Sequence, residues 1–132
     1  MANKVYPTFK ENSSMGALLT GVVKVVMVDE GAYTYSDAHQ FLSDIPSGAR
    51  IAISGALTSK AVSSLGAFTS GNARLDSVTG VSVEAVALFL DSGVPTTSQL
   101  VAYYDSGVTG LPVTPAGASY NVIPDSSGWF IM

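Results

Sequence analysis

The chain has 132 residues, of which 12% are charged and 47% hydrophobic, and its formal net charge is −4. This length suits one domain that buries a core without disulfides, and the absence of cysteine excludes disulfide scaffolds, thiolate metal sites and cysteine nucleophiles. The acidic balance disfavours electrostatic capture of nucleic acid or of an anionic membrane. With 18 serines and 10 threonines in place of the missing charges, the composition is typical of a β domain or of a subunit covered by neighbours.

Residues 1–14 are polar and have no regular period, and Tyr6, Pro7 and Phe9 are isolated within them. They contain no apolar segment of the kind that a secretory signal needs, and no later run reaches the ~20 apolar residues of a spanning helix. A fraying tail is one interpretation of this segment. The other, which we adopt, is an extended N-terminal arm that docks on a partner through its aromatic side chains.

The first half of the remaining chain predicts two β segments with one short helix between them. The β-branched run Val22–Val28 predicts a buried strand, which the turn residues Asp29–Gly31 end. Residues 37–45 predict the helix, with Ser36 as its cap and Pro46 after its end. Its apolar positions have helical spacing: Ala38, Phe41, Leu42 and Ile45. Residues 49–63 predict a bent β segment with a break at Gly55.

The second half alternates apolar runs with turn sequences. Residues 73–78 predict a weak strand, and residues 81–90 predict the clearest strand, central because its second half is apolar on both faces. Residues 100–104 predict its return strand, between two copies of Asp-Ser-Gly-Val that serve as successive loops of a meander. Two last strands, 119–123 and 129–132, are joined by an expected hairpin loop.

Together these elements predict one mainly β domain over residues 15–132. We expect an antiparallel β-sandwich or barrel of about seven to eight short strands, with the single helix near residues 37–45.

Residues able to do chemistry are few. His39 is the only histidine, so a histidine-rich zinc site is impossible, and no nucleophile elbow or phosphate-binding glycine loop occurs. The carboxylates fall mainly at turns, where bonds to nearby backbone amides explain them. Asp91 and Asp105 could supply oxygens to calcium, but the usual loop pattern is missing. We therefore expect no enzymatic activity, no cofactor and no metal.

The aromatic residues permit three interpretations. Tyrosine and tryptophan can stack on sugars or line protein interfaces, and they also pack in cores.

Glu84, the one charge in its strand, either marks an exposed strand start or pairs with a cation of a neighbouring subunit. The candidate partner-binding residues are Tyr6, Pro7, Phe9, Tyr33, Tyr35, Tyr104 and Trp129.

Two long stretches carry a resemblance to a family. They are VVKVVMVDEGAYTYSDAHQFLSDIPSGARIAISGALTSKAV and DSGVPTTSQLVAYYDSGVTGLPVTPAGASYNV. With the start MANKVYPTFKE, they resemble a small structural protein found in the virions of tailed bacteriophages. The resemblance covers nearly the whole chain and departs at residues 64–80 and after Ile123.

The resemblance implies a non-enzymatic virion component, and in particular a capsid decoration, or cement, protein. Such a protein is made in the host cytoplasm and binds the outside of the major capsid protein lattice, as a homodimer or homotrimer, without contacting nucleic acid or membrane. A tail, neck or fibre-attachment component is one alternative, and a receptor- or glycan-binding module displayed on the virion is another. We expect deletion of residues 1–12 to leave the domain folded and to weaken assembly.

Overall fold

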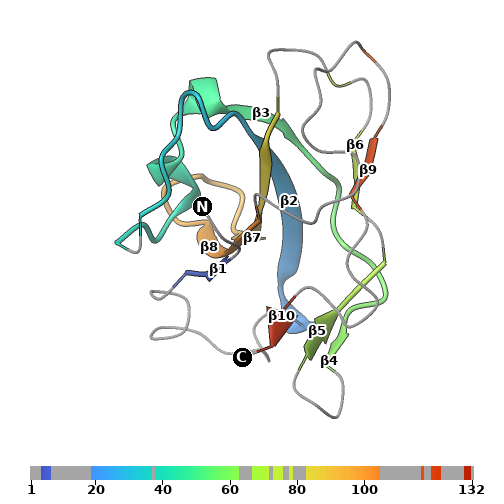
Figure 1. Ribbon diagram of the computed structural model, residues 1–132. Helices are drawn as coiled ribbons and strands as arrows, with labels where there is room; N and C mark the ends of the chain where they lie inside the picture. Colours follow the sequence, from blue (N-terminus) through green and yellow to red (C-terminus); the bar gives the residue numbers. More distant parts are fainter. Residues whose placement is uncertain are drawn as a thin grey trace.

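The computed structural model describes residues 4–6, 19–36, 38–62, 67–71, 73–75, 78, 83–104, 117, 120–122 and 130–131. Within these ranges the chain folds into antiparallel β-sheets with two short 3-10 helices (Figure 1). The prediction of a mainly β, antiparallel fold is confirmed.

The largest sheet has five strands in the spatial order β1-β8-β7-β2-β3. Its members are β1 (Lys4–Val5), β8 (Gln99–Tyr104), β7 (Ala85–Asp91), β2 (Val22–Val28) and β3 (Arg50–Ile53). The seven-residue strands β2 and β7 pair along their whole length, and the consecutive strands β7 and β8 are neighbours, as the meander predicts. Strand β2 has the bounds that the sequence predicts. The strand expected over residues 81–90 is β7, which begins at Ala85.

Two smaller sheets contain the remaining strands. One has the order β10-β5-β4, formed by Phe130–Ile131, Ala67–Thr69 and Ala61–Val62, and the other pairs β6 (Ala73–Leu75) with β9 (Tyr120–Val122). The expected hairpin between the last two strands is wrong, because β9 pairs with β6 and β10 pairs with β5. Each of these strands has a distant partner in the sequence, which turn signals cannot reveal.

The helix predicted over residues 37–45 is also wrong. Of the described residues 38–45, Leu42–Asp44 alone are helical, as the single 3-10 turn η1. Phe41 instead forms an isolated antiparallel bridge with Gln99 at the start of β8, and flanking backbone hydrogen bonds of 2.8 Å join the two segments. This pairing consumes backbone groups that a helix would have bonded locally, so a tertiary contact overrides the helical spacing.

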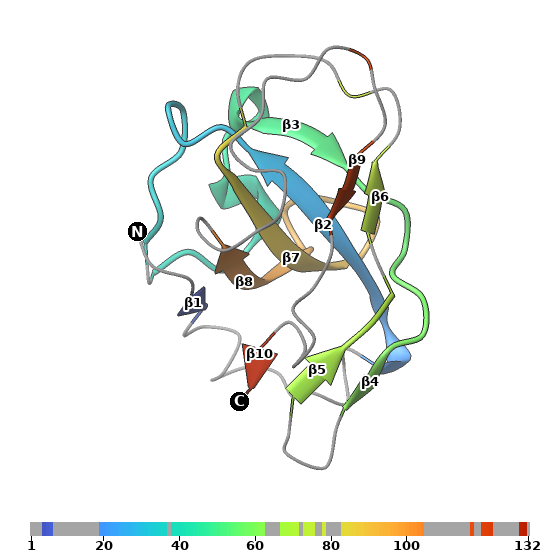
Figure 2. The same ribbon diagram turned by 45° about the vertical axis from the view of Figure 1, so that its right-hand side comes forward.

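The outer edge of β8 is covered by two segments placed end to end. β1 pairs with Ala102 and Tyr103, and the segment before η1 pairs with the beginning of β8. A second 3-10 turn, η2 (Ser47–Ala49), then leads into β3. In Figures 1 and 2 the segment between β2 and β3 lies beside β8 and β7, and β4, β5 and β10 gather near the start of β2.

The core is centred on β7. Its residues Ala85–Phe89 are buried without interruption, so both faces of this strand pack inside the molecule. Buried residues of β2, β8, the segment between β2 and β3, and the smaller sheets join the same hydrophobic cluster. A continuous apolar run in the sequence thus forms a central strand, as expected for two-sided burial.

Candidate functional site

Four tyrosines from three parts of the chain meet against β8. Tyr6 follows β1, Tyr33 and Tyr35 belong to the segment between β2 and β3, and Tyr103 lies in β8. Ring centroids are 4.9 Å apart for Tyr6 and Tyr35, 5.4 Å for Tyr35 and Tyr103, and 5.8 Å for Tyr33 and Tyr103. The rings are tilted by 36° to 55°, which is the usual geometry of aromatic packing. We call these four residues the tyrosine cluster.

Backbone contacts place two of these rings. The amide of Tyr6 donates to the carbonyl of Val101, with 2.9 Å between nitrogen and oxygen, which continues the β1–β8 pairing by one residue. The carbonyl of Asp29 accepts from the amides of Ala32 and Tyr33 at 3.0 and 3.1 Å, so the turn after β2 directs Tyr33 toward the sheet. The cluster therefore fastens the N-terminal strand and this turn to the same part of β8.

A hydrogen-bonded chain runs from the buried cluster to the only histidine. The hydroxyls of Tyr6 and Tyr33 are 2.8 Å apart, and the Tyr33 hydroxyl is 2.7 Å from Nδ1 of His39. The His39 ring also packs on Tyr33, with 5.3 Å between centroids. Burial raises the pKa of Tyr6 and of Tyr33 above the ordinary phenol value. We call this arrangement the His39–Tyr33–Tyr6 chain.

Two glutamates complete the other side of the cluster. The Tyr103 hydroxyl donates to Oε2 of Glu30, and the amide of Glu30 donates to Oε1 of Glu84 at 2.9 Å. Glu84 precedes β7, so its carboxylate holds the turn that follows β2. An internal role of this kind differs from both interpretations of Glu84 that the sequence suggested.

The contacts of this arrangement join separate parts of the chain. Phenols with raised pKa values stay protonated at neutral pH, so the hydroxyls of Tyr6 and Tyr33 are available there as hydrogen-bond donors. Among the described residues no three His, Asp or Glu side chains are grouped closely enough to hold a metal ion. The cluster acts as a cross-link of rings and hydrogen bonds between β1, β8 and the segment after β2.

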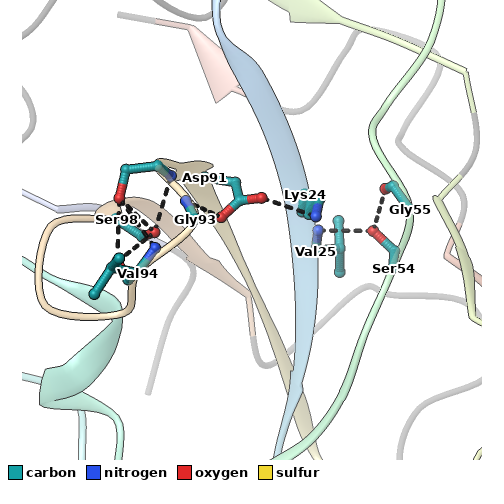
Figure 3. A network of polar contacts seen from close by, with 9 residues as sticks. Lys24, Val25, Ser54, Gly55, Asp91, Gly93, Val94 and Ser98 are labelled. Carbon is teal, nitrogen blue, oxygen red and sulfur yellow. Dashed lines mark hydrogen bonds and ion pairs between the residues drawn. The ribbon is translucent and has the colours of Figure 1, made fainter.

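A second polar network lies at the other end of β2 (Figure 3). Lys24 forms an ion pair with Asp91, with 2.8 Å between Nζ and Oδ2, and Oδ1 of Asp91 accepts from the amide of Gly93 at 2.9 Å. The Lys24 and Gly93 contacts hold the pKa of Asp91 below its ordinary range. Gly93 has a φ of +94°, which an L side chain rarely adopts. Asp91 therefore joins β2, β7 and the turn between β7 and β8.

Two buried serines extend this network into the backbone. The Ser98 hydroxyl donates to the carbonyl of Val94 at 2.9 Å and accepts from the amide of Ser92 at 3.0 Å. At the opposite side of β2, the Ser54 hydroxyl accepts from the amide of Val25 at 2.9 Å (Figure 3). The Ser54 hydroxyl takes the place of a backbone acceptor where β3 ends, and the Ser98 hydroxyl bonds the backbone of the loop between β7 and β8.

Apolar side chains are exposed at the strand ends and at one sheet edge. Among the described residues the large ones are Leu19, Val22, Ile53 and Val94, with exposed fractions of 41%, 44%, 46% and 51%. Val22 pairs with Asp91, and Asp91 lies three residues before Val94. Val22 and Val94 therefore belong to the same end of the sheet. Ile53 lies on the outer strand β3. We call these four residues the exposed apolar set.

The described residues among the predicted partner-binding residues differ in how deeply they are buried. Tyr6 and Tyr33 are buried within this domain, and Tyr35 and Tyr104 are partly buried against its core. The structure brings Tyr6, Tyr33 and Tyr35 together with Tyr103, whereas Pro7, Phe9 and Trp129 lie outside the described residues. The exposed apolar set was not predicted, because the sequence does not show which members of an apolar run stay uncovered.

No protein-family model and no curated protein sequence matches this chain. None of the helices formed by the described residues is long and apolar enough to cross a membrane.

Proposed function

We propose that the protein is a non-enzymatic structural component of a tailed-bacteriophage virion. In this proposal it is a capsid decoration protein that binds the outside of the major capsid protein lattice and stabilises the head. The observation that carries the proposal is the resemblance of nearly the whole chain, including FLSDIPSGAR, SGALTSK and TGLPVTP, to a small virion protein.

The use of polar groups inside the domain supports a structural role. His39 and the carboxylates of Glu30 and Glu84 all bond within the protein. These are residue types that enzymes use as acids and bases, and here they join strands and turns. Large aliphatic side chains among the described residues remain exposed for a partner, which suits association by apolar contact.

The exposed apolar set supplies the proposed contact surface. Val22 and Ile53 present aliphatic side chains that gain free energy when water is excluded from them. β3 is also an outer strand of its sheet, where a partner strand can add by backbone pairing. Each contact is weak by itself, but a lattice that holds many copies gains strength through avidity.

Particles that lack the protein provide the test. Purified protein is added to such heads, bound protein is measured by co-sedimentation, and rupture is followed during heating and osmotic shock. Because a decoration protein binds only the assembled shell, the heads should become more resistant as sites fill. Heads that rupture at the same temperature with and without bound protein contradict a cement role, and binding restricted to tails supports the tail or neck alternative.

Charge substitutions test the contact surface. Ile53→Asp places a carboxylate in the proposed apolar contact and should weaken binding to heads by roughly tenfold or more, because an unpaired charge would be desolvated. Ser47→Asp, at an exposed polar position in η2, is the matched control for the added charge. Equal binding by both variants, with unfolding curves unchanged, excludes Ile53 from the interface.

A further inference from the structure

The His39–Tyr33–Tyr6 chain connects a partly exposed histidine to the residue that follows strand β1. Tyr33 occupies the middle, with its hydroxyl 2.8 Å from that of Tyr6 and 2.7 Å from Nδ1 of His39. Tyr6 is fully buried. In the part of the chain that the structure describes, the Tyr6 hydroxyl forms its hydrogen bond with Tyr33.

The number of protons in this chain depends on the charge of His39. Two links join the three groups, and each link holds one proton. With a neutral imidazole whose proton is on Nε2, Tyr33 donates to His39 and Tyr6 donates to Tyr33, so both hydroxyl protons are used. Protonation of Nδ1 adds a third proton to the same two links. One hydroxyl then loses its acceptor, and a buried donor without an acceptor is unfavourable.

The loss of this hydrogen bond should affect the pairing of strand β1 with β8, because β1 is short. It has two residues, which pair with Tyr103 and Ala102, and it is continued by the backbone bond from Tyr6 to Val101. The Tyr6 side chain is therefore a principal anchor of this strand. We propose that protonation of His39 loosens β1 from β8, so that acidic pH releases the N-terminal strand.

Among the described residues, the carboxylates of Asp44 and Glu30 lie near this chain. Asp44 interacts electrostatically with His39. Burial acts to raise the pKa of Asp44, but hydrogen bonds from the amides of Gln40 and Phe41 outweigh it, so the pKa is lowered. The Glu30 carboxylate accepts from Tyr103 on the other side of the cluster. Histidine is the type of side chain whose charge changes between about pH 5 and pH 8.

Amide hydrogen exchange tests the release of β1 directly. Protection factors are measured for Tyr6, Val26 and Ala87 at about pH 8 and about pH 5, with the intrinsic rates divided out. The Tyr6 amide should lose roughly tenfold in protection at the lower pH, which corresponds to one orphaned buried hydroxyl. Val26 and Ala87, which pair between β2 and β7, should keep their protection and thereby separate local release from global unfolding.

Two variants complete the test. His39→Gln keeps a neutral acceptor for Tyr33, so its Tyr6 amide should stay protected at both pH values. Tyr33→Phe breaks both links, so Tyr6 protection should be low and independent of pH. The proposal is overturned if wild-type protection at Tyr6 does not change with pH, or if His39→Gln loses protection as the wild type does.

Discussion

Ser54 replaces a backbone acceptor where strand β3 ends. Its amide donates to the carbonyl of Val25 at 2.8 Å, but the Val25 amide donates to the Ser54 hydroxyl rather than to a carbonyl. Ser54→Ala removes this acceptor at a site that is 4% exposed. We expect the free energy of unfolding to fall by about 1–3 kcal/mol, because a buried amide is left unsatisfied.

Chemical denaturation measures this loss. Thr96→Ala, in the exposed loop between β7 and β8, is the control and should change stability by less than about 0.5 kcal/mol. If both variants unfold at the same denaturant concentration, the hydroxyl of Ser54 does not satisfy the Val25 amide in solution.

The ion pair between Lys24 and Asp91 predicts a pH dependence at the residue scale. The pKa of Asp91 is lowered by Lys24 first and by the amide of Gly93 second. A carboxyl with a lowered folded-state pKa stabilises the protein above its unfolded pKa of about 3.9, and this contribution is lost as the pH falls through the folded value. Exposed fractions of 28% and 22% for the two side chains limit the pair to about 0.5–1 kcal/mol.

Asp91→Asn should show this contribution as a difference between two stability curves. The variant should be less stable than the wild type at neutral pH, and the gap should close in acid below about pH 4. Urea unfolding of both proteins at several pH values measures the gap. A constant gap over the whole range means that the carboxylate charge contributes nothing.

At the scale of elements, the position of a strand in the sheet decides how much each side chain matters. Leu88 lies in β7, which is buried on both faces, whereas Ile53 lies on the outer strand β3 and is 46% exposed. Leu88→Ala should lower the free energy of unfolding by about 2–5 kcal/mol. Ile53→Ala should cost much less, because its side chain loses little burial, and thermal unfolding of the two variants compares them directly.

The elements that could be predicted from the sequence are those whose burial shows in their own residues. β2 and β7 are continuous apolar runs, and a strand buried on two faces reads as such a run. The segment around Phe41 has apolar residues at helical spacing, yet its backbone bonds to β8, a partner that local spacing does not encode. The final strands β9 and β10 were located by their composition, but their pairing with β6 and β5 was not predicted.

At the scale of the whole molecule, the same limit applies to the candidate site. The sequence singled out Tyr6 and Tyr33 as aromatic residues, but as surface anchors, because isolated tyrosines in polar segments carry no sign of burial. Their hydroxyls meet only after β1 has paired with β8 and the turn after β2 has folded against it. His39 was set aside as a lone histidine, and its bond to Tyr33 depends on that same tertiary contact.

Truncation at the N-terminus tests whether residues 1–6 belong to the domain or serve a partner. Deletion of residues 1–3 leaves β1 and Tyr6 in place and should leave stability unchanged. Deletion of residues 1–6 removes the backbone pairing to β8 and the fully buried Tyr6 ring. The loss of a buried aromatic side chain alone costs about 3–5 kcal/mol, so we expect the domain to be clearly destabilised, whereas the sequence led us to expect that deletion of residues 1–12 leaves the domain folded and weakens assembly.

Binding to heads separates the two roles of this segment when it is measured beside stability. If β1 acts only inside the domain, head binding by the longer deletion should recover at a temperature where the truncated domain is folded. If binding stays weak although the unfolding curve shows a folded domain, the segment also contacts the capsid. An intermediate deletion, of residues 1–5, keeps Tyr6 but removes both β1 pairs. Because the Tyr6 ring can still pack in its buried position against β8, this variant should be more stable than the deletion of residues 1–6.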